Sequence, residues 1–128
     1  MVTFEHLIVG GGRVTLAIHI RDGLVTVGSA YCHPRDQFCK RVGRDLAVDR
    51  LFSEERGAAS KYRVVFNHSD GLGVRGIKEE AVYRFLGHAV NPSSDTPPWA
   101  YNAMKHGQFC TVWEYNLLGW GAWGLPNF

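Results

Sequence analysis

The sequence predicts an α+β domain in which two or three helices pack on an antiparallel β-sheet of about four strands. A hairpin signal at Asp22-Gly23, a helical apolar repeat before Leu51 and alternating apolar residues in the second half all favour it. At 128 residues, the chain (1–128) is expected to form a single domain. Residues 1–12 are expected to form an N-terminal arm or a short strand, and residues 117–128 a tail rich in Trp and Gly.

The hairpin signal lies between two alternating segments, Arg13–Arg21 and Leu24–Tyr31. An Asp-Gly pair in this position is the strongest short-range indication of a two-residue β-turn. Such a turn puts four apolar residues on one face: Ile18, Ile20, Val25 and Val27. The opposite face has small or polar residues: Thr15, Ala17, Gly28 and Ala30, with His19 and Thr26 nearer the turn. A face of small side chains lets a second backbone layer approach closely. That layer is either a helix of this chain or the same surface of a second subunit.

An amphipathic helix is predicted from Pro34, which suits a first helical turn, to Leu51. Its apolar stripe is Phe38, Val42 and Leu46, flanked by Cys39, Gly43 and Ala47. The charged residues lie mostly on the other side: Lys40, Arg41, Arg44, Asp45 and Asp49. A glycine inside a helix costs about 1 kcal/mol relative to alanine, so Gly43 beside the stripe indicates close packing.

The remaining segments follow the same patterns. The expected strands are Phe4–Val9 (or an arm), Lys61–Asn67, Val74–Ile77 and Gln108–Asn116, and the expected helices are Lys78–Leu86, ended by Gly87, and Trp99–His106. A strand is the alternative over Lys78–Leu86. The expected connections are a turn at Gly10–Gly12, a linker at Glu54–Ser60, a turn at His68–Gly73 and a loop at Asn91–Pro98.

Composition limits the partners. The formal net charge of +2 is too small for a protein dedicated to duplex nucleic acid, which needs a dense Lys/Arg stripe, but it does not exclude a small anionic ligand. The chain shows neither a signal-peptide pattern nor an apolar run of membrane-spanning length. We therefore expect a cytoplasmic protein without a membrane partner, whose three cysteines are free thiols.

The sequence has no catalytic or metal-binding signature. Gly10–Gly12 lacks the later glycine and the Lys-Ser/Thr of a phosphate-binding loop. The candidate zinc ligands are scattered along the sequence: Cys32, His33, Cys39, His106 and Cys110. These residues lack the closely spaced ligand pairs that zinc sites use. Neighbouring strand residues such as Cys32 and His33 point in different directions. We therefore expect no metal, no cofactor and no enzymatic activity.

Two clusters have the chemistry of a nucleotide site. Asn67 and His68 offer groups for a base or sugar, and Arg75 offers a planar fork for phosphate. The alternative for these three is a solvated loop. Trp99, with Tyr101 and Asn102 beside it, stands next to the proline-rich loop, where aromatic rings suit base stacking.

The alternative for Trp99 is that it anchors its helix to the core. A third candidate is Arg35, at the expected helix start, where the helix dipole also favours an anion. Its alternative is an ordinary solvated face, because acidic residues are interleaved with the basic ones.

The hairpin and the following helix keep a recurring order of residues: Ala30, Cys32, Pro34, Asp36, Phe38, Gly43, Leu46-Ala47 and Arg50-Leu51. This segment, about a third of the chain, resembles small phage-encoded accessory proteins, most of all the first-described Thoeris anti-defence family. Members of that family are sponges. They sequester, without degrading, cyclic ADP-ribose-type signals of bacterial TIR-domain enzymes, and some also hold cyclic oligonucleotides of cGAS-like enzymes.

The resemblance implies a non-catalytic sponge that blocks host anti-phage defence. It also implies dimers that join into hexamers, with ligand sites at subunit boundaries. The small-residue face and the apolar tail with Trp120 and Trp123 independently lead us to expect an oligomer. The alternatives are a phage inhibitor that binds a protein or ribonucleoprotein host target, of the anti-CRISPR type, and a small enzyme acting on a nucleotide.

Overall fold

The computed structural model describes residues 2–52, 63–91 and 96–112. These residues form a five-stranded antiparallel sheet of order β4-β3-β2-β1-β5 and three helices, which confirms the predicted α+β fold. The elements are β1 (Val2–Val9), β2 (Gly12–Arg21), β3 (Leu24–Cys32), α1 (Lys40–Leu51), β4 (Arg63–Asn67), α2 (Val74–Ala89), α3 (Pro98–Lys105) and β5 (Phe109–Thr111). The fifth strand arises because the N-terminal segment is a strand rather than an arm.

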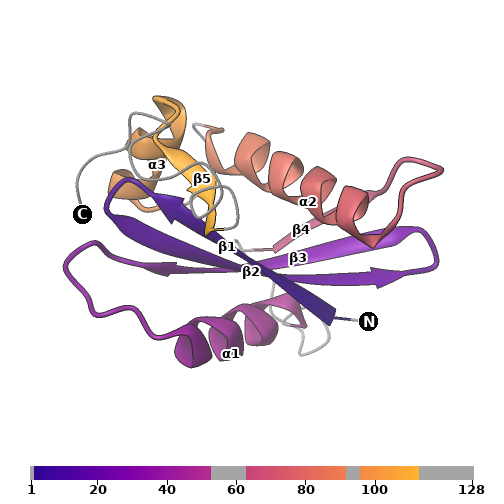
Figure 1. The fold of residues 1–128 in the computed structure, drawn as a ribbon, viewed down its shortest axis with the longest axis horizontal. Helices are drawn as coiled ribbons and strands as arrows, with labels where there is room; N and C mark the ends of the chain where they lie inside the picture. Colours follow the sequence, from indigo (N-terminus) through magenta and orange to yellow (C-terminus); the bar gives the residue numbers. More distant parts are fainter. Residues whose placement is uncertain (1, 53–62, 92–95, 113–128) are drawn as a thin grey trace.

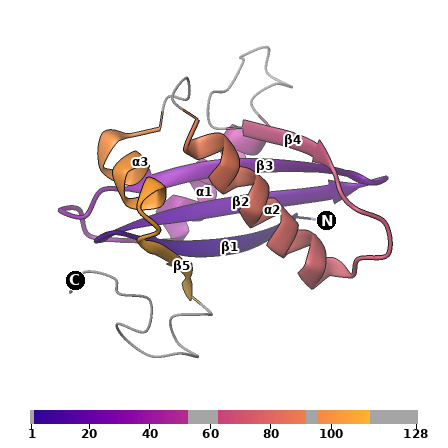
Figure 2. The ribbon, with the colours of Figure 1, turned by 90° about the horizontal axis from the view of Figure 1, so that it is seen from above.

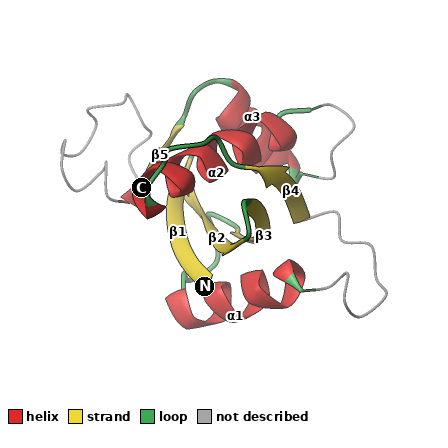
Figure 3. Ribbon diagram, turned by 90° about the vertical axis from the view of Figure 1, so that its right-hand side faces the viewer, coloured by secondary structure: helices red, strands yellow, loops and turns green. Residues whose placement is uncertain are grey.

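Helices cover both faces of the sheet. Helix α1 lies on one face, and α2 and α3 lie on the other (Figures 1 and 3). Figure 2 shows α2 crossing the strands and α3 near one end of the sheet. The main core fills the space under α2 and α3: Leu7, Val9, Val14, Leu16, Ile18, Val25, Val27, Ile77, Ala81, Phe85, Ala89, Ala100, Ala103 and Met104. A smaller cluster lies under α1: Ala17, Ala30, Ala47 and Leu51.

Both predicted turns in the first 32 residues are confirmed. Asp22 and Gly23 have φ angles of 51° and 81°, as a type I′ hairpin turn requires. The register pairs Ile20 with Val25, which places the apolar residues on the α2–α3 face. Gly10 has φ of 56°, and Val9 pairs with Gly12 across a second tight turn. The glycine triplet is therefore a turn between two strands.

Helix α1 packs directly on the small-residue face of the hairpin. A Cβ added to Gly28 would lie 2.3 Å from the Ala47 carbonyl oxygen, and one added to Gly43 would lie 2.7 Å from Thr15 Oγ1. The close approach predicted from the small residues is confirmed, and the second layer is a helix of the same chain. This face is therefore no longer a reason to expect a second subunit.

Two expectations about α1 are wrong. The helix begins at Lys40, because Pro34 lies in a turn closed by a 2.9 Å hydrogen bond from the Asp36 amide to the His33 carbonyl. Its buried residues are Ala47 and Leu51, whereas the predicted apolar stripe is exposed at Val42 (62%) and Leu46 (38%). The backbone comes closest where side chains are smallest, so the larger residues are turned away from the sheet. Cys39, expected to lie on the core side, is exposed.

The predicted strand Val74–Ile77 is also wrong, because these residues form the first turn of α2. That helix continues past Gly87 to Ala89. The buried residues recur every four positions: Ile77, Ala81, Phe85 and Ala89. This period is helical and spans the whole segment, so the helix predicted over Lys78–Leu86 is confirmed and lengthened in both directions.

The other elements agree closely with expectation over the part of the chain that the structure describes. Strand β4 lies within the predicted Lys61–Asn67, and α3 is displaced by one residue from the predicted helix. Strand β5 lies within the predicted Gln108–Asn116, of which residues 113–116 lie outside the described residues, as do the expected linker and the Trp/Gly tail. Among these helices, none has the length and apolar character needed to cross a bilayer.

Candidate functional site

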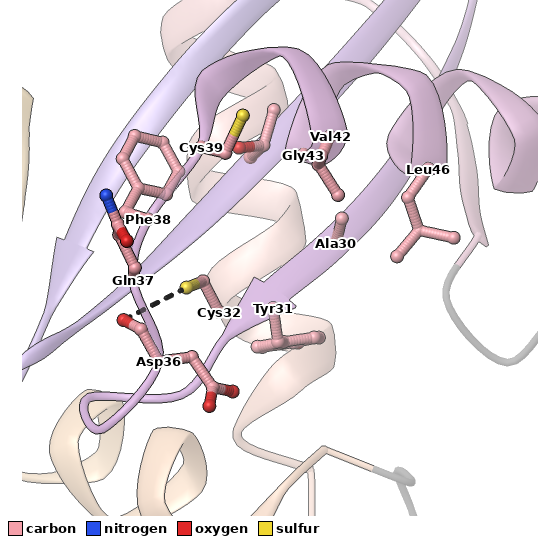
Figure 4. A pocket seen from close by; sticks show the side chains of 11 residues that line it. Ala30, Tyr31, Cys32, Asp36, Gln37, Phe38, Cys39, Val42, Gly43 and Leu46 are labelled. Carbon is pink, nitrogen blue, oxygen red and sulfur yellow. Dashed lines mark hydrogen bonds between the residues drawn. The ribbon is translucent and has the colours of Figure 1, made fainter.

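A groove opens between the N-terminal half of α1 and the end of β3 (Figure 4). We call it the α1–β3 groove. Its volume is about 260 Å³, and its lining residues are Thr15, Ala30, Tyr31, Cys32, Asp36, Gln37, Phe38, Cys39, Val42, Gly43 and Leu46. A second hollow of about 200 Å³ shares Cys32, Asp36 and Phe38 with it and reaches Gly12 and Arg13. The two hollows therefore adjoin at the loop before α1.

The loop between β3 and α1 shapes one wall of this groove. The Arg35 amide donates a 3.0 Å hydrogen bond to His33 Nδ1, which reinforces the turn at Pro34. The loop then brings Phe38, which is half-buried, against the sheet. The ring centroids of Phe38 and His6 lie 6.1 Å apart in a T-shaped arrangement, and the Arg13 guanidinium lies over the Phe38 ring, 5.9 Å from its centroid. Phe38 is thereby held as a flat aromatic surface with a cation beside it.

His6 lies beside the groove and close to several cations. His6 Nδ1 lies 3.2 Å from Thr15 Oγ1, and Thr15 lines the groove. Burial lowers the pKa of His6, and the nearby charges of Lys40, Arg44 and Lys78 lower it further. Cations that disfavour a charged imidazole would favour a bound anion at the same place.

This arrangement predicts how stability depends on pH. Because the folded-state pKa of His6 lies below its unfolded value, the unfolded chain takes up the proton more readily. The stabilisation that His6 contributes to the free energy of unfolding is therefore fully present above the ordinary histidine pKa of about 6.5, and it is lost as the pH falls below that value. We expect the free energy of unfolding to fall less between pH 7.5 and pH 5 in His6→Gln than in the wild type. Urea titrations across this range test this, and parallel curves would contradict it.

The thiol of Cys32 is not set up as a nucleophile. Burial, and next the Asp36 carboxylate, raise its pKa, with Arg13 opposing them. Its Sγ donates to the carbonyl oxygens of His33 and Asp36, each at 3.8 Å, and His33 Nδ1 accepts from a backbone amide. A protonated thiol bonded to carbonyls is a poor nucleophile. In the described ranges, no three His, Cys, Asp or Glu side chains are grouped to hold a metal ion.

The seven residues predicted to contact a ligand fall into separate places. Asn67 pairs with Leu24, and the His68 amide bonds to the Gly23 carbonyl at 3.1 Å, so both lie beside the β2–β3 turn. Arg75 lies in the first turn of α2 at the same end (Figure 1), not on a strand, and is exposed. It forms a 3.6 Å ion pair with Glu79. This group therefore lies on open surface.

Arg35 and Trp99 lie near the other end of β3. The Trp99 ring contacts His33 at 5.7 Å and Tyr31 at 6.2 Å, and Arg35 bonds to the same His33. Nine residues of β3, about 3.3 Å each, separate this end from Leu24. One small ligand cannot contact both groups.

Within α3, the three predicted residues have different surroundings. A Cβ on Gly12 would lie 2.5 Å from the Trp99 ring, which also packs against the main core. These contacts favour the alternative in which Trp99 anchors the helix. Tyr101 lies under Lys105, whose Nζ is 5.7 Å from the ring centroid, and Asn102 is exposed. The three residues do not make one stacking surface.

Sequence reasoning missed three residues at or beside the groove. Phe38, which lines it, was assigned to the core stripe of the helix. Arg13, which lines the adjoining hollow, and His6, whose ring contacts Phe38, were not considered as site residues. A signal was present, because Arg13 alternates with the apolar residues of β2 and so had to lie on the small-residue face. Comparison with family models, curated proteins and solved structures finds no match to this sequence.

Proposed function

We propose that this protein binds a small cyclic nucleotide, of the cyclic ADP-ribose type or a cyclic oligonucleotide, and sequesters it without degrading it. In this proposal it acts in the cytoplasm of an infected bacterium and blocks an anti-phage defence that depends on such a signal. The observation that carries the proposal is the α1–β3 groove. It combines an apolar, partly aromatic wall with the Asp36 carboxylate, and the hollow that adjoins it reaches Arg13.

The groove has complementary surfaces for the two parts of a nucleotide. Phe38, with Ala30 and the α1 side chains Val42 and Leu46, offers an apolar wall for a base. The exposed cation Arg35 stands on the loop that shapes one wall, where it can reach phosphate oxygens. The Asp36 carboxylate in the groove can accept a hydrogen bond from a ribose hydroxyl or an exocyclic amine.

Sequestration also agrees with the chemistry of the groove residues, which are unsuited to nucleophilic catalysis. Binding needs no acid, base or nucleophile, and the raised pKa of the Cys32 thiol keeps it in its less reactive form. A sponge instead needs slow release, which follows from enclosing the ligand.

The groove volume of about 260 Å³ is slightly below the roughly 300–1,000 Å³ of typical small-molecule pockets, and the groove is open on one side. A second copy of the chain placed over it would supply the missing wall. We therefore include self-association in the proposal.

The decisive experiment recovers the ligand. The purified full chain is incubated separately with cyclic ADP-ribose isomers and with cyclic dinucleotides, freed of unbound nucleotide and denatured by heat. Mass spectrometry of the released material should find an intact cyclic nucleotide. A cleaved product would establish a nucleotide-degrading enzyme instead. Retention of no nucleotide would reject the proposal and favour an inhibitor of a protein or ribonucleoprotein target.

The groove also predicts which arginine contributes to binding. Arg35→Ala should lower the affinity for the nucleotide about tenfold to a hundredfold, because a charge-assisted hydrogen bond to phosphate is worth about 1.5–3 kcal/mol. Arg75→Ala is the matched control, since Arg75 lies at the other end of the sheet. Both side chains are exposed, so the fold should survive both changes. Calorimetry in which Arg75→Ala loses as much affinity as Arg35→Ala would move the site away from the groove.

A further inference from the structure

The first strand carries rings on the face of the sheet that α1 covers. Phe4 pairs with Ala17, which belongs to the cluster under α1, so Phe4 and the next residue but one, His6, lie on that face. Both side chains are half-buried, which leaves part of each ring at the surface. The intervening Glu5 points to the opposite face, where its carboxylate forms a 3.6 Å ion pair with Lys78. This half of β1 therefore presents rings beside α1, and its carboxylate lies elsewhere.

Two exposed cations of α1 lie on the side of the helix toward these rings. The Arg44 guanidinium lies over the Phe4 ring, 5.9 Å from its centroid. Burial lowers the pKa of His6, and the charges of Lys40 and Arg44 lower it further, so both cations are close to β1. The first acidic residue of α1, Asp45, lies about 100° further around the helix than Arg44. The rings of β1 are therefore flanked by positive charge.

The helix and the strand run side by side in opposite directions. The start of α1 lies near His6, because the ring of Phe38, two residues before the helix, contacts it. The end of α1 lies near the start of β1, because Phe52 contacts the ring of His19, which pairs with Val2. Side chains on one face recur about every 6.6 Å along a strand, and residues four apart recur about every 6 Å along a helix. The rings of β1 and the cations of α1 therefore form two parallel rows with a similar repeat. We call this surface the α1–β1 strip: Phe4, His6, Phe38, Lys40, Arg44 and Phe52.

We infer that the α1–β1 strip binds a single-stranded nucleic acid. Proteins that bind unpaired strands combine aromatic rings for the bases with cations along the phosphate backbone. In this arrangement, bases stack on the exposed parts of Phe4 and Phe38, and phosphates lie along Lys40 and Arg44. The repeat along the strip is close to the spacing of successive nucleotides in an extended strand. An anionic membrane attracts cations without requiring rings at a fixed spacing, so the regular repeat favours a strand.

The strip is distinct from the α1–β3 groove. Val42 and Leu46 line the groove from one flank of α1, whereas Arg44 lies on the flank toward β1. Of the strip residues, Phe38 lines the groove as well and marks the border between the two surfaces. The inference therefore goes beyond the proposed function, and either can hold without the other.

The first test uses fluorescence anisotropy of labelled single strands, one RNA and one DNA, each about ten nucleotides long. Binding of either strand to the full chain supports the inference, and the tighter one identifies the preferred sugar. The duplex of the same sequence should bind about tenfold more weakly, because its bases are already stacked inside. Equal binding of the duplex or of polyphosphate would overturn the inference, since charge alone would then explain the affinity. Binding of anionic lipid vesicles without binding of either strand would overturn it in favour of a membrane surface.

Two variants separate the roles of ring and cation. Phe4→Leu keeps an apolar side chain and removes the ring, so it should weaken binding about tenfold with an unchanged salt dependence. Arg44→Ala should weaken binding and make the fall of log affinity with log salt concentration shallower by about 0.7. Arg84→Ala is the matched control and should change neither quantity, because Arg84 lies over Phe66 at 5.4 Å on the other face of the sheet. Losses in Arg84→Ala equal to those in Arg44→Ala would overturn the inference.

A competition experiment keeps the two proposed sites apart. An excess of cyclic dinucleotide should leave the affinity for the single strand unchanged. Displacement of the strand would place it in the α1–β3 groove and overturn the inference. Retention of a cyclic nucleotide without binding of a single strand disproves only this inference, whereas the reverse result disproves only the proposed function.

Discussion

Replacing Gly28 with valine is expected to lower the free energy of unfolding by about 3 kcal/mol or more. The first added carbon would already lie 2.3 Å from the Ala47 carbonyl oxygen and 2.5 Å from the Leu51 amide nitrogen. Both are main-chain atoms, so no side-chain rotation relieves the clash. Helix α1 must move off the sheet, and overpacking of this kind costs about 1–3 kcal/mol even where neighbours adjust. Urea denaturation followed by circular dichroism measures the loss.

Gly87 provides the matched control for this prediction. It lies inside α2 with open space where a Cβ would be added. Gly87→Ala should leave stability unchanged or raise it by up to about 1 kcal/mol, since alanine favours a helix. A Gly28→Val variant as stable as Gly87→Ala would show that α1 does not pack against β3 in this way.

The second large effect is expected from Phe85→Ala. Phe85 is among the largest fully enclosed side chains described, with 2% of its surface exposed. It contacts Tyr31 of β3 across the core, with ring centroids 6.3 Å apart. Its removal leaves a cavity between α2 and the sheet, and such truncations cost about 3–5 kcal/mol. Thermal and urea unfolding should both report the loss.

Tyr83 serves as the comparison because it lies on the same helix but is 77% exposed. Tyr83→Ala should change stability by no more than about 0.5 kcal/mol. Comparable losses in the two variants would mean that α2 does not bury Phe85 against the sheet.

The parts of the fold that the sequence predicted well are those set by local chemistry. The Asp22-Gly23 turn fixes the register of its hairpin, because both residues adopt positive φ and the loop has two residues. The small residues opposite Ile18 likewise predicted a close second layer. These signals need no knowledge of distant contacts, which is why they could be read directly.

The errors occurred where tertiary packing decided between local options. The hydrophobicity of Val42 and Leu46 predicts that they form the buried face of the helix. Gly43 and Ala47, however, allow the helix backbone closer to the sheet, and the helix packs through these smaller residues instead. In α2, Val74–Ile77 was predicted to be a strand and Gly87 to end the helix. The buried period of four residues, from Ile77 to Ala89, overrode both.

The groove was harder to foresee than the fold. Its Phe38 contacts His6 and Arg13 from two other segments, and only the sheet pairing and the loop after β3 bring the three together. Residue chemistry alone selected Arg75 and Trp99, which have suitable side chains but lie at opposite ends of the sheet. Arg35 was expected at a helix start, but it lies in the turn before α1, five residues ahead of Lys40, so the α1 dipole does not act at Arg35.

The main-chain contact between α1 and β3 also determines how rigid the groove is. Its walls near this contact are formed by Ala30, Gly43 and the backbone beside them, which have no side-chain rotamers to lose. Immobilising one flexible side chain on binding costs about 0.5–1.5 kcal/mol, and this part of the wall avoids that cost. A molecule that fits the groove therefore meets a wall that is already in place. The advantage of such preorganisation appears mainly as a longer residence time rather than as faster capture.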